Sequence, residues 1–217
     1  SLPSLSKVIK LGGPDAMTQV GLCLQFAVCN RLAMACAGVD ALVALSISMQ
    51  TISVLSVFTG TMIGSSSPII AVLPGQRDYS GEASLLKLSL AGVLAIATIG
   101  TLGFEFFASQ AVWFYRITDP EQAAMVIHAM QIFVLLHVPR YTLITYCRYL
   151  KVIGLANYAT LVSAMNDCGA ILPIAWLLTR LLGINGLWIA FPLTSYLLLL
   201  FVLMRNCSLE RQSKGRL

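Results

Sequence analysis

The amino-acid sequence predicts an all-α membrane protein, a bundle of six transmembrane helices. Three observations lead to this prediction: 58% of the 217 residues are hydrophobic, only 11% are charged, and the mean hydropathy is +0.83. A soluble domain carries roughly 25% charged residues, because it must cover its core with polar side chains. Since no long charged faces separate the apolar runs, lipid is the expected solvent for most of the chain.

Each predicted helix is an apolar run long enough to cross the hydrocarbon core of a bilayer, which takes about 20 residues. The segments are 16–37, 42–62, 88–107, 123–138 with its extension to 149, 156–178 and 187–203. They are helices rather than strands because they are long, lack period-two alternation and must satisfy their backbone groups internally. Residues 1–204 therefore form one transmembrane lobe, and 205–217 form a basic cytoplasmic tail.

Glycine and proline mark the predicted boundaries between these segments. Breaks are expected at Gly12-Gly13-Pro14, Gly38, Pro74-Gly75, Asp119-Pro120, Gly154 and Gly183-Ile184-Asn185-Gly186. Before the fourth segment, either Thr118 or Asp119 is the expected N-cap, and Pro120 is the first helical residue.

Basic residues are distributed unevenly between the two sets of connections. With a cytoplasmic N-terminus, ten basic residues lie inside: Lys7, Lys10, Arg77, Lys87, Arg148, Lys151, Arg205, Arg211, Lys214 and Arg216. Three lie outside: Arg31, Arg116 and Arg180. The positive-inside rule therefore predicts a multi-pass protein of the cell (plasma or inner) membrane with both termini in the cytoplasm.

Polar side chains gather on one face of each of the first two predicted spans. Those of the first span lie within an arc of about 140°: Asp15, Thr18, Gln19, Gln25 and Asn30. Those of the second are Ser46, Gln50, Ser53, Ser56 and Gly60. The stripes indicate either a hydrated cleft or helices joined by small and polar residues. The candidate substrate-lining residues are Gln19, Gln25, Asn30, Ser46, Gln50 and Ser53.

An ionisable residue lies near the middle of the fifth predicted span, where Asn166 precedes Asp167. A carboxylate at this depth is a functional-site hypothesis by default. Pro173 would free a backbone carbonyl one turn earlier, so backbone and carboxylate together could ligate Na⁺ or hold a proton. The alternative is an aspartate that is protonated or hydrogen-bonded and only joins two helices. The candidate ion-coupling residues are Asp167, Asn166 and, at the entrance to the first span, Asp15.

The fourth predicted span holds two histidines and an arginine. His128 and His137 are nine residues apart, on opposite sides of a helix, so they do not form a metal pair. Arg140 lies beside a kink at Pro139 and is expected to reach the cytoplasmic interface by snorkelling.

Other functional classes find no support in the sequence. The six cysteines include no CxxC pair and are interpreted as small apolar fillers. With no HExxH, GxSxG or P-loop motif, the sequence predicts neither an enzyme nor a cofactor or metal site. The net charge of +5 sits at the ends of apolar runs, which does not fit a nucleic-acid-binding patch.

Several motifs follow one another in a particular order over nearly the whole chain. They are KLGGP at 10–14, ALVALSI at 41–47, SPII at 67–70, PGQ at 74–76, YRITDPE at 115–121, Gly154, ANY at 156–158, Asn166 and GINGLWIA at 183–190. Each is weak alone, and their order and spacing supply the specificity. Together they resemble one six-helix lobe of the multidrug and toxic compound extrusion (MATE) transporters.

Members of this family have twelve helices in two such lobes, and the opening segment and basic tail here look more like the second lobe. The resemblance implies efflux of cationic or amphipathic small molecules by alternating access, driven by Na⁺ or H⁺. It also implies a partner lobe, supplied by the rest of a longer chain, a separate subunit or a homodimer.

The family's usual ion site is not carried over by this resemblance. Many members have a carboxylate in the first helix of the second lobe and another in the fourth. Here the corresponding depth of the first span carries Gln19, Leu22 and Gln25, and the fourth span has no carboxylate.

Two other functions stay open at this point. The first is a lipid-linked oligosaccharide flippase of the same superfamily, which would need a large basic central cavity, and Arg140 is the one residue that suggests it. The second is a non-transporting membrane scaffold or fragment, which would be closely packed without a hydrated cleft.

Overall fold

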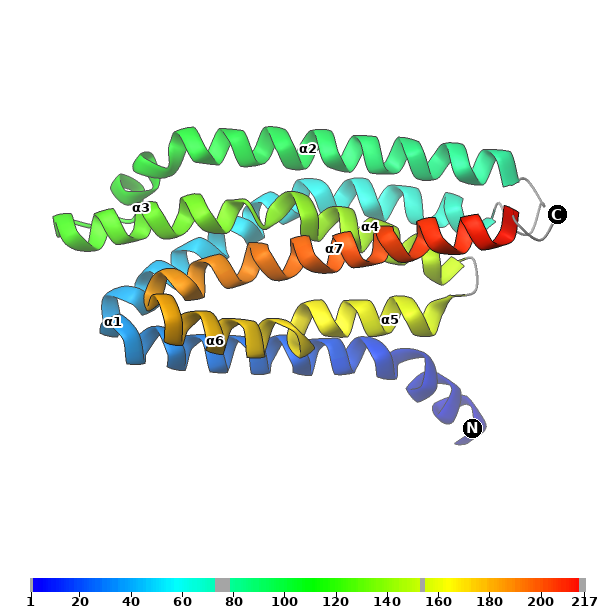
Figure 1. Cartoon of the computed structure of the whole chain (residues 1–217), viewed down its shortest axis with the longest axis horizontal. Coiled ribbons are helices and arrows are strands. Elements are labelled where there is room, and N and C mark those ends of the chain that lie inside the picture. Colours follow the sequence, from blue (N-terminus) through cyan, green and yellow to red (C-terminus); the bar gives the residue numbers. More distant parts are fainter. Residues whose placement is uncertain (1, 73–78, 153–154, 215–217) are drawn as a thin grey trace.

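A computed structural model describes residues 2–72, 79–152 and 155–214, and within them the side chains of 19–65, 84–151 and 155–205. In these ranges the chain is helical, and the helices pack lengthwise into a bundle (Figure 1). The elements are α1 (Leu2–Val72), α2 (Tyr79–Phe114), α3 (Pro120–Val134), α4 (His137–Val152), α5 (Ala156–Ala164), the π-helix η2 (Met165–Gly169), α6 (Ile171–Leu182) and α7 (Ile184–Lys214).

Five helical stretches among the described residues are long and apolar enough to cross a membrane. They are Gln19–Ser65, Ser84–Phe114, Pro120–Lys151, Ala156–Leu182 and Ile184–Arg205. Large apolar side chains cover their outer faces; Phe106 and Trp113, for example, are 80% and 82% exposed. Such a surface suits lipid rather than water, so the predicted class, an all-α multi-pass membrane protein, is confirmed.

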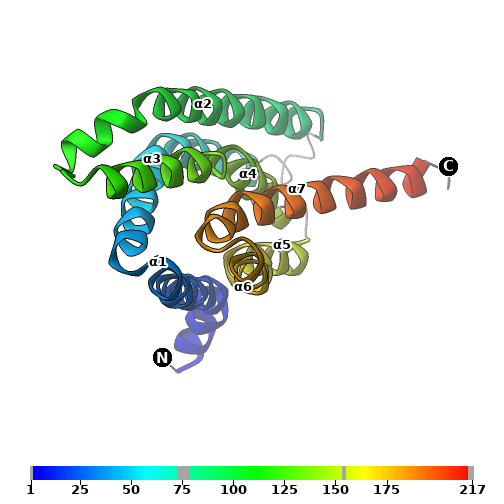
Figure 2. The same ribbon diagram turned by 60° about the vertical axis from the view of Figure 1, so that its left-hand side comes forward.

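The first stretch is 47 residues long and turns back on itself at Gly38, as Figures 1 and 2 show. A straight helix of that length would measure about 70 Å, more than twice the thickness of a bilayer's hydrocarbon core. Ala37 and Gly38 leave the helical conformation, and Gly38 has φ 67°. Glycine adopts positive φ without steric penalty, which explains why the predicted break falls at this residue.

Of the other predicted boundaries, those at Asp119-Pro120 and at Gly183 are confirmed and one is wrong. The Asp119 carboxylate accepts a hydrogen bond of 3.1 Å from the Glu121 N–H, so Asp119 is the N-cap of α3, with Pro120 following it. Gly183 has φ 64° between α6 and α7. The predicted break at Gly12-Gly13-Pro14 is wrong, since α1 is helical from Leu2 onward. Helices tolerate such residues in membranes when neighbouring groups satisfy the freed backbone. The breaks predicted at Pro74-Gly75 and Gly154 lie outside the described residues.

The fourth and fifth predicted spans are each divided into two helices. Between α3 and α4 the chain tightens, and the Leu136 N–H donates to the Phe133 carbonyl at 3.0 Å. Pro139 then lies in the first turn of α4, where a missing N–H breaks no helical hydrogen bond. The fifth span widens into η2, where the Ala170 N–H donates to the Met165 carbonyl at 2.8 Å. The segment predicted as the tail continues α7 as a helix as far as Lys214.

The main core joins α1, α3, α6 and α7 around an aromatic cluster. The ring centroids of Phe133 and Phe191 are 4.6 Å apart, and those of Phe133 and Trp188 are 5.7 Å apart. At Gly186 there is no room for a side chain, because a Cβ would collide with the backbone of Leu178. This close approach of α7 to the end of α6 fixes the half of the bundle that contains η2.

Candidate functional site

The π-helix η2 places two polar side chains inside the bundle. Asn166 and Asp167 are 3% and 8% exposed, and both lie near the middle of the stretch Ala156–Leu182. A π-turn adds one residue to a helical turn, and such turns occur often at functional sites. The predicted depth of these residues in the membrane stretch is therefore matched by their burial in the protein.

A salt bridge connects Asp167 to α4. The Arg140 Nη2 donates to the Asp167 Oδ1 at 3.0 Å, and the two side chains are 19% and 11% exposed. The expectation that Arg140 snorkels to the cytoplasmic interface is wrong, because a buried carboxylate within reach attracts its guanidinium more strongly than distant headgroups do.

Hydrogen bonds extend this pair to α7. The Asn166 Nδ2 donates to the Asp167 Oδ1 at 3.4 Å, and the Ser195 Oγ donates to the Asn166 Oδ1 at 2.9 Å. Four side chains from α4, η2 and α7 thus form one chain of polar contacts. Such networks are stronger in a low-dielectric interior than in water, so it joins the three elements tightly.

The first half of α1 also packs against η2. A Cβ built at Gly21 would lie 3.3 Å from the Cβ of Cys168, so the two backbones approach closely. Gln25 follows one helical turn later on the same face. It is 4% exposed, and its Nε2 has no hydrogen-bond partner in the part of the chain that is described. A buried amide without a protein partner is a donor for water or for a bound molecule.

The other predicted lining residues lie elsewhere. Gln19, Asn30, Ser46, Gln50 and Ser53 are all exposed on α1. The hydroxyls of Ser46 and Ser53 donate to the carbonyls of Leu42 and Met49, both at 2.9 Å. These two serines therefore satisfy their hydroxyls on their own helix.

Two hollows near the α2–α3 turn contain members of the second stripe. Ser46 lines one of about 450 Å³, and Gln50 lines another of about 390 Å³. Gln25, in contrast, is buried beside η2. Within the described residues Gln25 therefore has different surroundings from Ser46 and Gln50, and a cleft shared by the first two spans stays a prediction. The side chain of Asp15 lies outside the described residues.

The histidines occupy different environments, as their spacing predicts. His128 is exposed, whereas His137 is fully buried and its ring stacks 4.6 Å from that of Tyr141. Across the described ranges no three His, Cys, Asp or Glu side chains are grouped as metal ligands. Cys23, Cys29, Cys36, Cys147 and Cys168 are free thiols.

Sequence reasoning missed the partners of Asp167. Arg140 was recognised as a charge within the fourth span and Asp167 as a charge within the fifth, but they were not paired. Opposite charges inside a membrane bundle usually pair with one another, and this rule would have joined them. Ser195 gave no comparable signal, because serines are common between membrane helices.

Comparison with known proteins identifies the fold. No protein-family model matches the chain, and no curated protein is significantly similar to it. Three solved structures that match are described in the following terms. An inward-facing conformation of a multidrug resistance MATE family transporter of the MOP superfamily has a TM-score of 0.84 and 15% identity, over 98% of this chain and 50% of that chain. An outward-facing conformation described in the same words has a TM-score of 0.81 and 14% identity, over 97% and 48%. A MATE structure in complex with MaL6 also has a TM-score of 0.81 and 14% identity, over 97% and 49%.

These matches define the class of fold. The chain is an all-α membrane bundle that resembles half of a MATE transporter, and it spans about half the length of the structures that it matches. At 14–15% identity the likeness concerns the fold alone.

Proposed function

We propose that the chain is one lobe of a cation-coupled exporter that moves cationic or amphipathic small molecules out of the cytoplasm by alternating access. The observation that carries this proposal is the Arg140–Asp167 pair, held at a π-turn in the middle of a membrane-crossing stretch. Ionisable residues at such depth typically serve ion or proton pathways. The likeness of the fold to half of a MATE transporter supports the same function.

The proposed topology has six passes and both termini in the cytoplasm. Its support is that the 47-residue stretch divides at Gly38 into two helices, and that α1 begins at the end of the bundle where α7 finishes (Figure 1). The connections at that end carry most of the basic residues in the sequence, as cytoplasmic connections do.

Coupling would act through the salt bridge. Na⁺ or H⁺ bound at Asp167 would neutralise its carboxylate and so remove most of the attraction that holds Arg140, and with it α4, against η2. Asn166 would position the Asp167 carboxylate, and Ser195 would in turn position Asn166. Because the ion binds one arrangement of α4 and η2 better than the other, it would shift the population between them.

The substrate path is proposed to begin at Gln25. Its unpartnered amide is buried next to η2, and the remaining candidates (Gln19, Asn30, Ser46, Gln50 and Ser53) present polar groups on the exposed surface of α1. A partner lobe would close this surface into a cleft. That lobe would come from a longer chain, a separate subunit or a second copy, and Asp15 would lie at the cytoplasmic entrance.

Transport by inside-out vesicles tests the proposal. The protein, together with whatever completes it in the cell, is assayed for uptake of ethidium under an imposed H⁺ or Na⁺ gradient. Asp167→Asn is expected to abolish the part of the uptake that depends on the gradient, whereas Asp119→Asn, which changes a helix cap at a bundle end, is expected to retain it. Unchanged transport with unchanged Na⁺ and pH dependence in Asp167→Asn would overturn the coupling role.

The two alternatives are supported less well. The flippase would need a large basic central cavity, and Arg140, the residue that suggests one, is paired with the carboxylate of Asp167. A scaffold would be closely packed throughout, and it would have no use for the buried, unpartnered amide of Gln25.

A further inference from the structure

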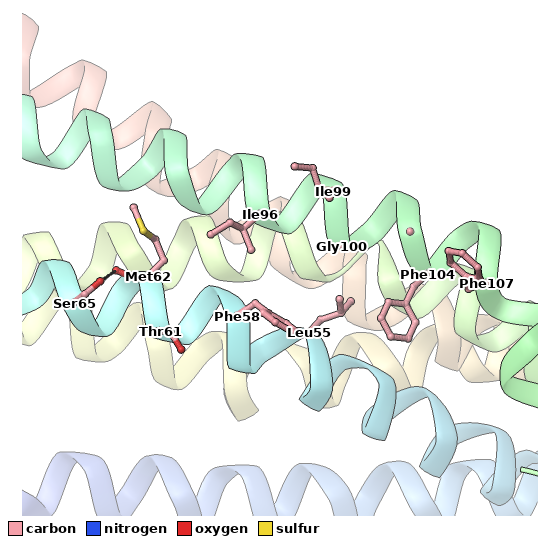
Figure 3. Close-up of a pocket in the computed structure, with 11 residues that line it drawn as sticks. Leu55, Phe58, Thr61, Met62, Ser65, Ile96, Ile99, Gly100, Phe104 and Phe107 are labelled. Atoms are coloured by element: carbon pink, nitrogen blue, oxygen red, sulfur yellow. Dashed lines mark hydrogen bonds between the residues drawn. The ribbon is translucent and has the colours of Figure 1, made fainter. Parts of the chain in front are cut away.

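A long apolar groove runs along the outside of the bundle between the second half of α1 and α2, as Figure 3 shows. Its volume is about 800 Å³. Leu55, Phe58 and Met62 form one wall, and Phe104 and Phe107 lie on the other. On the α2 side Leu55 packs closely against Gly100, whereas at Gly103 the absence of a side chain leaves the groove open.

The chemistry of the groove fits a hydrocarbon chain. The two polar residues in its lining, Thr61 and Ser65, donate their hydroxyls to the carbonyls of Val57 at 2.7 Å and Met62 at 3.1 Å. The walls therefore present no hydroxyl donor that is free for a polar ligand. Both helices are long and apolar enough here to cross a membrane, so hydrocarbon is the expected surrounding of the groove.

A second hollow borders the groove on the side of the α2–α3 turn, and its lining includes the polar side chains of Gln50, Thr51 and Gln110. This hollow of about 390 Å³ shares Phe104 and Phe107 with the groove and extends to Trp113 and Phe114. These two aromatic residues also line the hollow that contains Arg116. Exposed aromatic residues beside a basic residue are typical of the membrane–water interface. The path thus leads from an apolar groove to a cation at the level of the headgroups.

Arg116 is an unusual residue for its position. It has φ 53°, and the Ile117 N–H donates to the Val112 carbonyl at 3.1 Å, which is the helix-ending motif that normally has glycine at this point. In the described part of the chain no carboxylate lies within 4.0 Å of its guanidinium. A non-glycine residue with positive φ is strained, and such strain gathers at functional positions.

We infer that this groove is a binding site for one membrane phospholipid, with its phosphate at Arg116 and an acyl chain between α1 and α2. Phosphate is an anion that a guanidinium binds in a bidentate manner. Half the hydrocarbon thickness is about 15 Å, or about ten helical residues, which is the length from Phe114 back to Phe104. An acyl chain held at Arg116 therefore passes the hollow at Phe107 and enters the near end of the groove at Phe104 and Gly103. This inference does not depend on the proposed export activity.

A pair of glycine variants tests the inference. A Cβ at Gly103 would meet nothing within 4 Å, so Gly103→Leu fills the groove without a clash. Gly60→Leu is the matched control, because Gly60 lies on the facing helix with equally open surroundings but outside the groove lining. The full chain is incubated with phosphatidylcholine vesicles, extracted in mild detergent, and its retained phospholipid is counted by native mass spectrometry.

The expected result is one tightly retained phospholipid in the wild type and in Gly60→Leu, and at least about fivefold less in Gly103→Leu. Arg116→Gln should weaken retention of phosphatidylcholine and phosphatidylglycerol alike, because both carry the phosphate. Arg180→Gln, which removes a cation stacked 5.4 Å from the ring of Trp176, should leave retention unchanged. Equal retention in the two glycine variants would overturn the inference.

A second measurement is independent of protein yield. Phosphatidylcholine with brominated chains should quench the emission of Trp113, measured as the difference between the wild type and Trp113→Phe. Gly103→Leu should lower this quenching while Gly60→Leu preserves it. A disulfide-linked dimer formed by Gly103→Cys in native membranes would show that a second copy covers the groove, and would also overturn the inference.

Discussion

Polar side chains on the two sides of the bundle have different kinds of hydrogen-bond partners. On the inner side, at η2, the side chains of Arg140, Asn166, Asp167 and Ser195 bond to one another across three elements. On the side of the α1–α2 groove, Thr61 and Ser65 bond only to the backbone of their own helix. The inner contacts thus hold separate helices in one arrangement, whereas the two groove hydroxyls, where their side chains are described, make no bond from one helix to the other.

The largest predicted loss of stability comes from removing one partner of the inner ion pair. Arg140→Leu leaves the Asp167 carboxylate buried without its cation, which typically costs 3–5 kcal/mol. The double variant Arg140→Met, Asp167→Leu removes both charges and should recover most of that loss. Thermal unfolding of the purified protein in detergent should rank the wild type as the most stable, the double variant second and Arg140→Leu last. A double variant no more stable than Arg140→Leu would show that the pair is not the determining contact.

The next effect concerns the hydrogen bond from α7. Ser195→Ala removes the donor to the Asn166 Oδ1, and an unpaired buried acceptor costs about 1–3 kcal/mol. Ser48→Ala is a suitable control, because Ser48 is equally buried and its hydroxyl donates to the carbonyl of Ala44 within its own helix. We expect the midpoint of chemical denaturation to fall clearly in the first variant and little in the second. Equal shifts would contradict the view that Ser195 joins α7 to η2.

Gln25→Leu tests whether the buried amide of Gln25 contributes to stability or to transport. The buried Nε2 of Gln25 has no partner among the described residues, so an apolar residue of similar size should be neutral or stabilising by about 1 kcal/mol. Export, if Gln25 contacts the substrate, should decrease at the same time. Thermal unfolding and vesicle uptake measured on one preparation distinguish the two effects. Reduced stability together with unchanged uptake would indicate that the amide is structural.

The smallest effect is expected on the outer side. Thr61→Val removes a hydroxyl that bonds within α1 at an exposed position, so the change in unfolding free energy should stay within about 0.5 kcal/mol. The same unfolding assay measures it. A loss comparable to that of Ser195→Ala would mean that the groove side also depends on polar contacts.

Local patterns in the sequence predicted the fold and part of the site. The break at Gly38, the cap at Asp119 and the depth of Asp167 depend on residue type and on distance along one helix, which a sequence displays directly. The pairing of Arg140 with Asp167 requires knowing which helices are neighbours, and the sequence contains that information only through packing. The π-turn was missed although Gly169 lies within it, because a single glycine inside an apolar run does not indicate that one residue has been inserted into the helix.

The groove was missed for a related reason. Gly100 and Gly103 look like ordinary small residues of a membrane helix. Only the position of the second half of α1 shows that Leu55 packs against Gly100 while Gly103 faces an open space. Similarly, Ser46 and Gln50 share a helical face, as predicted, but that face borders the α2–α3 region. The helical period predicts which residues share one face of a helix, but only the structure shows which other element that face contacts.

The reversal at Gly38 connects the two sides mechanically. The first half of α1 rests on η2 through Gly21, while the start of the second half is tied to α3 by a hydrogen bond of 2.8 Å from the Gln122 Nε2 to the Asp40 Oδ1. With the second half anchored, a displacement of the first half must be absorbed by backbone rotation near Gly38. Gly38 is therefore the hinge between the two halves, and the half that it releases contacts η2 at Cys168, the residue after Asp167. Stiffening this hinge would restrict that half without altering any polar contact.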